Sequence, residues 1–157
     1  MTGQSPASAS RPEIGGYFGL DLPPSGSNPH AGALALNSAR NGLLYLLHAR
    51  RPRRVHLPSY ICDSMLQPLR QAGAAHRFYA IDERLEIARP PRLAPSELLL
   101  YVNYFGVKSG YCRQLAAHYG DALVVDDSQA LYADPLPGVA TLYSPRKFVG
   151  VSDGGYL

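Results

Sequence analysis

The class of fold follows from one stretch of the sequence, Leu123-Val124-Val125-Asp126-Asp127-Ser128-Gln129. A short apolar run that contains β-branched residues and ends in acidic and polar ones is typical of a buried parallel strand. In open α/β sheets, ligands bind beyond the carboxyl ends of the strands, which is where Asp126 would lie. Asp126 is therefore a candidate ligand-binding carboxylate. The alternative is that Asp126 only caps a following helix, which is the commoner role for an aspartate after a strand.

A second stretch carries a candidate nucleophile. It reads Leu142-Tyr143-Ser144-Pro145-Arg146-Lys147-Phe148 and is followed by Asp153-Gly154-Gly155. The chain has only two lysines, Lys108 and Lys147. A lysine can lose its proton and attack a carbonyl carbon, whereas arginine stays protonated. Ser144 could bind a phosphate while Lys147 holds an aldehyde, and pyridoxal phosphate (PLP) carries both groups on one ring. The alternative is a solvated lysine in a proline-containing turn.

The two stretches together suggest how such a ring would be held. Asp126 could pair with a protonated pyridine nitrogen and keep the ring electron-withdrawing, while Gln129 could donate a hydrogen bond to the phenolic oxygen. Neighbouring residues of a strand point to opposite faces of the sheet, so only one of the two adjacent aspartates can reach the ring. The spacing to Gln129 favours Asp126 over Asp127.

These motifs resemble a known family. The pattern Asp126-x-x-Gln129, then Ser144-x-x-Lys147, then Asp153-Gly154-Gly155 is similar to that of the fold-type-I PLP-dependent enzymes. More narrowly, it resembles the sugar aminotransferase family of the DegT, DnrJ, EryC1 and StrS proteins. The similarity spans about residues 33–157 and includes three upstream segments: 36–43 at the first large helix, 57–82 as a strand–helix–strand unit, and 102–106, which resembles a Val-His-x-x-Gly strand end.

The resemblance implies an α/β fold, namely the three-layer, mostly parallel sheet of the fold-type-I PLP-dependent transferase large domain, here truncated. It implies a PLP-dependent aminotransferase, with Lys147 as the catalytic residue. The enzyme would move an amino group from an amino acid such as glutamate to a keto-sugar nucleotide, and would be a homodimer at full length. Two alternatives stay open: another PLP reaction such as dehydration or elimination, and a non-catalytic remnant that only binds a partner.

Two departures from the family pattern concern the cofactor contacts. Ala39-Arg40-Asn41 stands where the phosphate-binding turn usually reads Gly-Thr/Ser-Ala. Cys62 falls near the position of the aromatic residue that commonly stacks on the ring, and Tyr60 lies two residues earlier. The residues expected to bind the cofactor are Arg40, Asn41, Tyr60, Cys62, Asp126, Gln129, Ser144 and Lys147.

Hydrophobic periodicity predicts alternating strands and helices, and hence right-handed crossovers and a mostly parallel sheet. The expected helices are 39–49, 62–72 and 110–119, and the expected strands are 55–57, 76–81, 98–103, 122–126, 140–143 and 155–157. Residues 1–12 are rich in Ser, Ala and Pro and are expected to be a disordered lead. Residues 13–157 are expected to be the N-terminal portion of the PLP-binding large domain, without its small domain. The last strand would then be an uncovered edge.

Composition narrows the class of protein. With 157 residues and 46% hydrophobic content, the chain can bury a real core. A net charge of +3 with one basic cluster at residues 50–54 gives no reason to expect a nucleic-acid partner. The two cysteines, Cys62 and Cys112, have no metal-like spacing and favour a reducing compartment. No stretch reaches the length of a membrane span and no signal core is seen, so we expect a cytoplasmic protein without a membrane partner.

Overall fold

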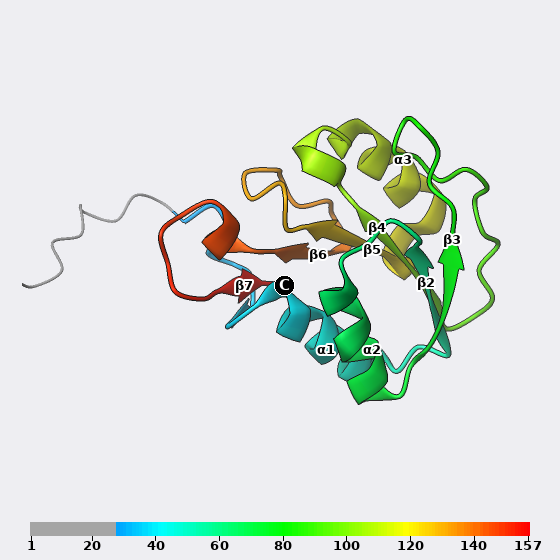
Figure 1. Ribbon diagram of the computed structural model, residues 1–157, viewed down its shortest axis with the longest axis horizontal. Helices are drawn as coiled ribbons and strands as arrows, with labels where there is room; N and C mark the ends of the chain where they lie inside the picture. Colours follow the sequence, from blue (N-terminus) through cyan, green and yellow to red (C-terminus); the bar gives the residue numbers. More distant parts are fainter. Residues whose placement is uncertain (1–27) are drawn as a thin grey trace, which may run out of the picture.

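A 7-stranded sheet in the order β1-β7-β6-β5-β4-β2-β3 organises the protein, and helices cover both of its faces (Figure 1). The computed structural model describes residues 28–157. The strands are β1 (Ala35–Leu36), β2 (Arg54–Pro58), β3 (Ala75–Tyr79), β4 (Glu97–Val102), β5 (Leu123–Asp127), β6 (Ala140–Tyr143) and β7 (Gly155–Tyr156). The expected lead at 1–12, like the rest of residues 1–27, lies outside the described residues.

The helices α1 (Ala39–Arg50) and α2 (Leu66–Ala72) lie on one face of the sheet, and α3 (Ser109–Tyr119) lies on the other (Figure 1). The crossover β2-α2-β3 and the crossover β4-α3-β5 run in opposite directions along the sheet. Two right-handed crossovers of opposite direction place their helices on opposite faces. The predicted α/β architecture with a mostly parallel sheet is confirmed.

Helix α1 forms where the sequence predicts it. Ser38 caps it, since the Ser38 hydroxyl accepts a hydrogen bond from the Asn41 backbone N–H at 3.2 Å. Leu43 and Leu47 are spaced four apart, lie on the same face and are almost completely buried. Burying a side chain of this kind contributes roughly 2 kcal/mol. The helix ends at Arg50, and the capping residue Arg51, which precedes a proline, has a left-handed backbone (φ 46°).

The second predicted helix has a different start from the one expected. Residues 63–65 form a 3₁₀ turn, and only Leu66–Ala72 are α-helical. Pro68 lies in the first turn of α2, where its missing N–H would have no partner inside the helix. Gly73 then ends the helix with a left-handed backbone (φ 63°).

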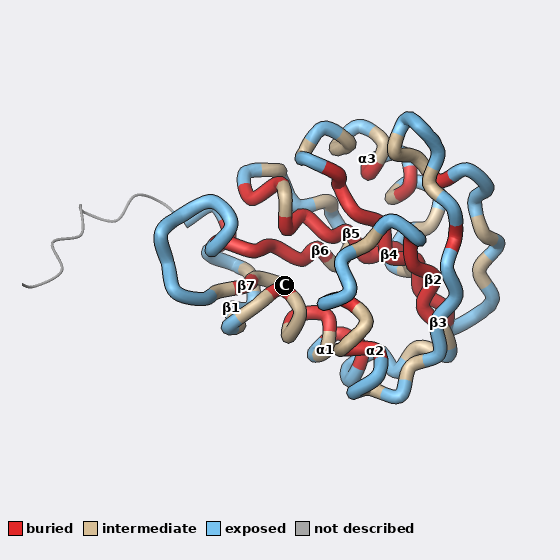
Figure 2. Tube along the Cα trace, in the orientation of Figure 1, coloured by how far each residue is buried: buried red, intermediate tan, exposed pale blue. Residues whose placement is uncertain are grey.

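The core is centred on the parallel strands. Every residue of β4 and β5 is buried (Figure 2). Helix α1 packs against the same sheet through Leu43, which is completely buried. Strand β3 forms one edge of the sheet, and four of its five residues are exposed. Two polar side chains of β2 are paired with β4: Arg54 and His56 each lie 2.9 Å from the buried carboxylate of Glu97.

The expectation for the last strand was wrong in one respect. Strand β7 is not an uncovered edge, because it lies between β6 and β1 and pairs antiparallel with both. Helix α1 also packs against it. The partner strand β1 has only Ala35 and Leu36 and lies in a stretch where no element was predicted, since two residues are too few to show a period. Among residues 28–157 no helix is both long and apolar enough to cross a membrane.

Candidate functional site

The predicted site residues come together because four strands end at the same edge of the sheet. Strands β2, β4, β5 and β6 are parallel, so their carboxyl ends lie side by side. In this register Val102 lies opposite Asp126, and Asp126 lies opposite Leu142. The segments that leave these strands, 59–62, 103–106, 128–129 and 144–147, therefore border one region.

Two cavities occupy this region. The first, of about 260 Å³, has an aromatic and apolar wall. Its lining residues are Tyr60, Ile61, Cys62, Val102, Tyr104, Phe105, Asp126, Ser128, Gln129 and Lys147. Two of its aromatic rings, Tyr60 and Tyr104, stack on each other with ring centroids 5.5 Å apart and planes within 16°. Such a wall suits a flat, unsaturated ring.

The second cavity, of about 270 Å³, is polar and basic. Its lining residues are Ser38, Ala39, Arg40, Cys62, Ser64, Met65, Asp126, Ser128, Ser144, Arg146 and Lys147. They supply hydroxyl groups, three cationic side chains and the first turn of α1. Backbone N–H groups at the start of a helix and cationic side chains both favour an anion. This cavity is therefore suited to a phosphate.

The two cavities share part of their walls. Cys62, Asp126, Ser128 and Lys147 border both. A ligand that has a flat ring in the first cavity and an anionic group in the second would pass directly between these side chains. The arrangement brings the predicted nucleophile and the predicted carboxylate to the boundary between the two cavities.

Asp126 and Asp127 face different surroundings, as their positions on β5 predict. Asp126 borders the two cavities just described, and one of its carboxylate oxygens accepts a hydrogen bond from the Ser128 backbone N–H at 2.9 Å. Asp127 borders a separate cavity of about 310 Å³. There its carboxylate accepts a hydrogen bond from the Asn103 amide at 2.8 Å. Burial raises the pKa of Asp127 from its ordinary value of 3.8 to about 6, and the nearby charge of Asp126 adds to that rise.

The side-chain amide of Gln129 is anchored through its oxygen atom. Its side-chain oxygen accepts a hydrogen bond from the Phe105 backbone N–H at 2.6 Å. That contact fixes the orientation of the amide, because only the oxygen can accept from an N–H group. The amide nitrogen of Gln129 is left as a donor at the wall of the first cavity. The turn that delivers the Phe105 N–H has left-handed backbone at both Phe105 (φ 55°) and Gly106 (φ 74°).

Two predicted residues follow strand β2. Tyr60 is 58% exposed, and its backbone carbonyl accepts a hydrogen bond from the Tyr104 hydroxyl at 2.7 Å. Cys62 is exposed, and its sulfur lies 3.1 Å from the Ser64 hydroxyl. The Ser64 hydroxyl is the main cause that lowers the pKa of the Cys62 thiol, followed by the Ser64 backbone N–H; the charge of Lys147 contributes less.

The start of α1 contributes one predicted residue and not the other. Arg40 borders the second cavity, where its guanidinium donates to the Gln67 side chain at 2.7 Å. Asn41 borders neither cavity: its backbone N–H binds the Ser38 cap and its side chain donates to Asn37 at 2.5 Å. The structure thus brings together all the predicted site residues except Asn41.

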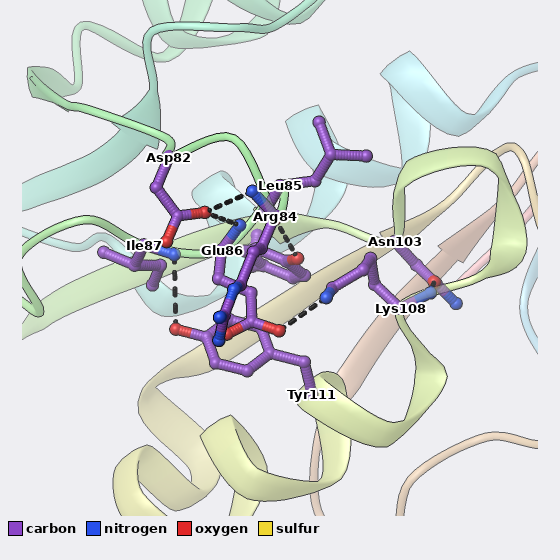
Figure 3. Close-up of polar contacts among 9 residues, drawn as sticks. Asp82, Arg84, Leu85, Glu86, Ile87, Asn103, Lys108 and Tyr111 are labelled. Atoms are coloured by element: carbon purple, nitrogen blue, oxygen red, sulfur yellow. Dashed lines mark hydrogen bonds and ion pairs between the residues drawn. The ribbon is translucent and has the colours of Figure 1, made fainter.

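The two lysines are in contrasting positions. Lys108 lies 2.5 Å from the Glu86 carboxylate and is held in a polar cluster beside Tyr111, as Figure 3 shows. The side-chain amine of Lys147 makes no hydrogen bond or ion pair with any residue in 28–157, and Lys147 borders both cavities. Its segment, a 3₁₀ turn at Pro145–Lys147, directly follows Ser144, which is 4% exposed and borders the second cavity.

Sequence reasoning missed several residues of the two walls. Tyr104, Phe105, Ser128 and Arg146 border the cavities and were not among the expected contacts. Each follows the carboxyl end of a strand directly or within three residues. The rule that located Asp126 would have found them had it been applied to every parallel strand.

No family model matches the sequence, and a search of curated proteins also finds no match. Solved structures do resemble the fold. The sugar aminotransferase CalS13 from Micromonospora echinospora is 18% identical with a TM-score of 0.59, and the match covers 79% of this chain and 40% of that chain. The putative sugar aminotransferase Spr1654 from Streptococcus pneumoniae, in its PLP form, is also 18% identical with a TM-score of 0.61, over 79% of this chain and 40% of that one.

A third structure has a different activity. L-threonine-O-3-phosphate decarboxylase from Porphyromonas gingivalis is 15% identical with a TM-score of 0.63, and the match covers 79% of this chain and 43% of that chain. The matched region thus spans about two fifths of the length of each of these proteins. This protein therefore has, over most of its length, the α/β fold found in sugar aminotransferases.

Proposed function

We propose that the joined cavities bind PLP and that the protein provides the cofactor-binding part of a PLP-dependent aminotransferase. One observation carries the proposal. Lys147, Asp126 and Cys62 border both an aromatic cavity and a basic, hydroxyl-lined cavity. PLP has a flat ring with an aldehyde on it and a phosphate on a short arm, so its parts match this pair of cavities.

The residues present fit each part of the cofactor. Ser144, Ser128 and Arg40, with the start of α1, would hold the phosphate. Tyr60 and Tyr104 supply the aromatic wall beside the ring. The Asp126 carboxylate would hold the proton on the pyridine nitrogen, and the amide nitrogen of Gln129 would donate to the phenolic oxygen.

When bound, PLP supplies an electron-withdrawing ring that accepts the electron pair left behind when an amino acid loses the proton on its α carbon. The side chains of this protein would do the rest. The Lys147 amine would hold the aldehyde carbon in place, and once displaced by the amino donor it would carry the α proton as general base. The buried carboxylate of Asp126 would keep the ring nitrogen charged throughout.

The finer assignments rest on the family resemblance and on the activities that the similar structures name. We propose glutamate as the amino donor and a keto-sugar nucleotide as the acceptor, in a cytoplasmic homodimer. Lys108 has no part in this scheme, because it is engaged with Glu86.

Reductive trapping tests the proposal. The protein is incubated with PLP, treated with borohydride and digested, and the peptides are mapped by mass spectrometry. We expect a pyridoxyl label on Lys147 that persists in Lys108→Ala and is lost in Lys147→Ala. Since the chain has only these two lysines, each variant controls for the other. A label on Lys108 with none on Lys147 would overturn the assignment.

A second reaction class comes from one observation, namely that a decarboxylase shares this fold, with a TM-score of 0.63. The acceptor distinguishes the classes. With the amino donor alone, an aminotransferase converts PLP to pyridoxamine phosphate, and a keto acceptor then converts the pyridoxamine phosphate back to PLP. A decarboxylase releases carbon dioxide and leaves the cofactor as PLP. Absorbance spectra with and without the acceptor separate the two.

A further inference from the structure

Cys62 carries a thiol to which the proposed cofactor contacts give no role. It follows β2, is exposed, and lies in the wall that the two cavities share. We propose that Cys62 is a modification site, at which an acidic low-molecular-weight disulfide exchanges with the thiol and the mixed disulfide then blocks the anion-binding cavity. That the blocked ligand is PLP rests on the function proposed above, whereas the modification itself rests on the cavity.

The surroundings of Cys62 favour its reactive form. Its sulfur lies 3.1 Å from the Ser64 hydroxyl, and hydrogen bonds from the Ser64 hydroxyl and backbone lower the pKa of the thiol, as does the charge of Lys147. Burial and the charge of Asp63 oppose this effect without reversing it. The thiolate is the species that attacks a disulfide, so a lowered pKa raises the reactive fraction at neutral pH.

The chain contains a matched comparison. Cys112 on α3 is 2% exposed, and burial raises the pKa of its thiol to about 12. It borders the cavity of Asp127, on the other face of the sheet. Cys112 would therefore remain protonated and unreactive under conditions in which Cys62 exchanges.

The cavity next to Cys62 is built to receive an anion. Ser128 and Ser144 border this cavity and are only 7% and 4% exposed. Within residues 28–157, neither hydroxyl makes a hydrogen bond to another residue, and no fully buried side-chain oxygen there lacks a partner, so both hydroxyls are accessible to a ligand in this cavity. Arg40, Arg146 and Lys147 add positive charge to the same wall. A peptide disulfide with free carboxylates, such as glutathione disulfide, matches these groups.

The exchange balances without an added oxidant. The Cys62 thiolate attacks one sulfur of the disulfide, a new S–S bond forms to that sulfur, and the original S–S bond breaks. The other half leaves as a thiolate and takes up the proton that Cys62 lost. A dithiol reductant reverses the reaction, so the block is reversible.

The test uses the full chain at pH 7 with glutathione disulfide and follows the intact mass. We expect a single glutathione adduct that maps to Cys62, is removed by dithiothreitol, and is absent in Cys62→Ser. Inorganic phosphate and PLP, added separately, should each slow the reaction, since both occupy the adjacent cavity. Ser64→Ala should slow it about three- to tenfold by removing the hydrogen bond that lowers the thiol pKa.

The two lysines supply a further control. Lys147→Met should slow formation of the adduct at Cys62, whereas Lys108→Met, which changes the net charge by the same amount, should not. Circular dichroism confirms that each variant is folded. Equal labelling of Cys112 in the folded protein, or no protection by phosphate, would overturn the inference. Protection by phosphate together with no PLP label on Lys147 would refute the proposed cofactor and leave the modification site standing.

Discussion

Asp126 and Asp127 are neighbours on β5, and their side chains border cavities on opposite faces of the sheet. Asp126 lies with Lys147 at the boundary between the aromatic and the basic cavity. Asp127 faces Asn103 and the side of the sheet covered by α3. Because the two carboxylates face different surroundings, we expect substitution of Asp126 to affect ligand binding and substitution of Asp127 to affect stability.

The first prediction concerns ligand binding. Asp126→Asn should weaken PLP binding at least about tenfold, because an amide cannot stabilise the charge on a pyridinium nitrogen and a charge-assisted hydrogen bond is lost. Asp127→Asn should leave the dissociation constant unchanged. Absorbance titration with PLP measures both. An equal loss in the two variants would show that the assignment of faces to functions is wrong.

The second prediction concerns stability and pH. The folded state raises the pKa of Asp127 from 3.8 to about 6, so the folded protein binds that proton more tightly than the unfolded chain does. The free energy of unfolding contributed by Asp127 therefore increases as the pH falls from about 6 toward 4, and it is least favourable at pH 7. Asp127→Asn should remove this dependence and stabilise the protein at pH 7 by about 3 kcal/mol.

Urea unfolding of both proteins between pH 4 and pH 8 gives the measurement. The difference between wild type and Asp127→Asn is the informative quantity, since other carboxylates titrate in the same range in both proteins. The asparagine can still accept the hydrogen bond from Asn103, so the substitution changes charge and keeps the contact. A difference that does not vary with pH would contradict the prediction.

The third prediction concerns the close approach of β7 to the start of α1. A Cβ atom at Gly155 would lie 2.1 Å from the Ser38 carbonyl carbon and 2.3 Å from the Ala39 nitrogen. Both are backbone atoms, so the neighbours cannot yield by rotating a side chain. Gly155→Ala should destabilise the protein by about 3 kcal/mol or more and displace the first turn of α1.

Gly150 provides the control for that change. A Cβ atom there would meet nothing within 4 Å, and its backbone is not left-handed. Gly150→Ala should therefore stay within about 0.5 kcal/mol of wild type. Thermal unfolding of the two variants tests the contrast, and similar melting temperatures would mean that the contact between Gly155 and Ser38 is not tight in solution.

The fourth prediction concerns the aromatic wall. Tyr104→Phe keeps the ring but removes the hydrogen bond to the Tyr60 carbonyl, so the turn that carries Tyr60 and Cys62 should loosen. Tyr119→Phe removes a comparable hydrogen bond, to the Pro91 carbonyl, away from both cavities. Each should cost about 1 kcal/mol of stability.

Only Tyr104→Phe should also weaken PLP binding, by roughly three- to tenfold. The two variants are compared by urea unfolding and by absorbance titration. Loss of affinity in both would mean that stability alone controls binding, and the positioning role of Tyr104 would be refuted.

Much of the fold was predictable because the strands are apolar runs of ordinary length. The apolar run at Leu123–Val125 and the acids after it located a buried parallel strand and the end of that strand at which the two cavities lie. Strand β1 could not be found in this way, since Ala35 and Leu36 are ordered by their pairing with β7. The prediction that residues 155–157 form an uncovered edge was wrong for the same reason: whether a strand lies inside a sheet depends on a partner that is distant in the sequence.

The position of the candidate site was predictable where chemistry and spacing coincide, since Lys147 and Asp126 border the same two cavities. Tyr104 and Arg146 were missed because a tyrosine or an arginine after a strand has many ordinary roles. Only the folded structure shows that they line the cavities. Asn41 shows the converse. Its place in the sequence suggested a cofactor contact, but the Ser38 cap uses its backbone N–H.

The contact between Gly155 and Ser38 has a kinetic consequence. The segment that carries Lys147 starts at the end of β6 and is closed at its other end by Gly154 and Gly155 against Asn37 and Ser38. The walls of the basic cavity therefore include residues near both ends of the described chain, and folds that depend on contacts of such long sequence separation form slowly. We therefore expect the cavity to be completed late in folding, so ligand binding during refolding should report the arrival of the native state rather than the formation of its helices.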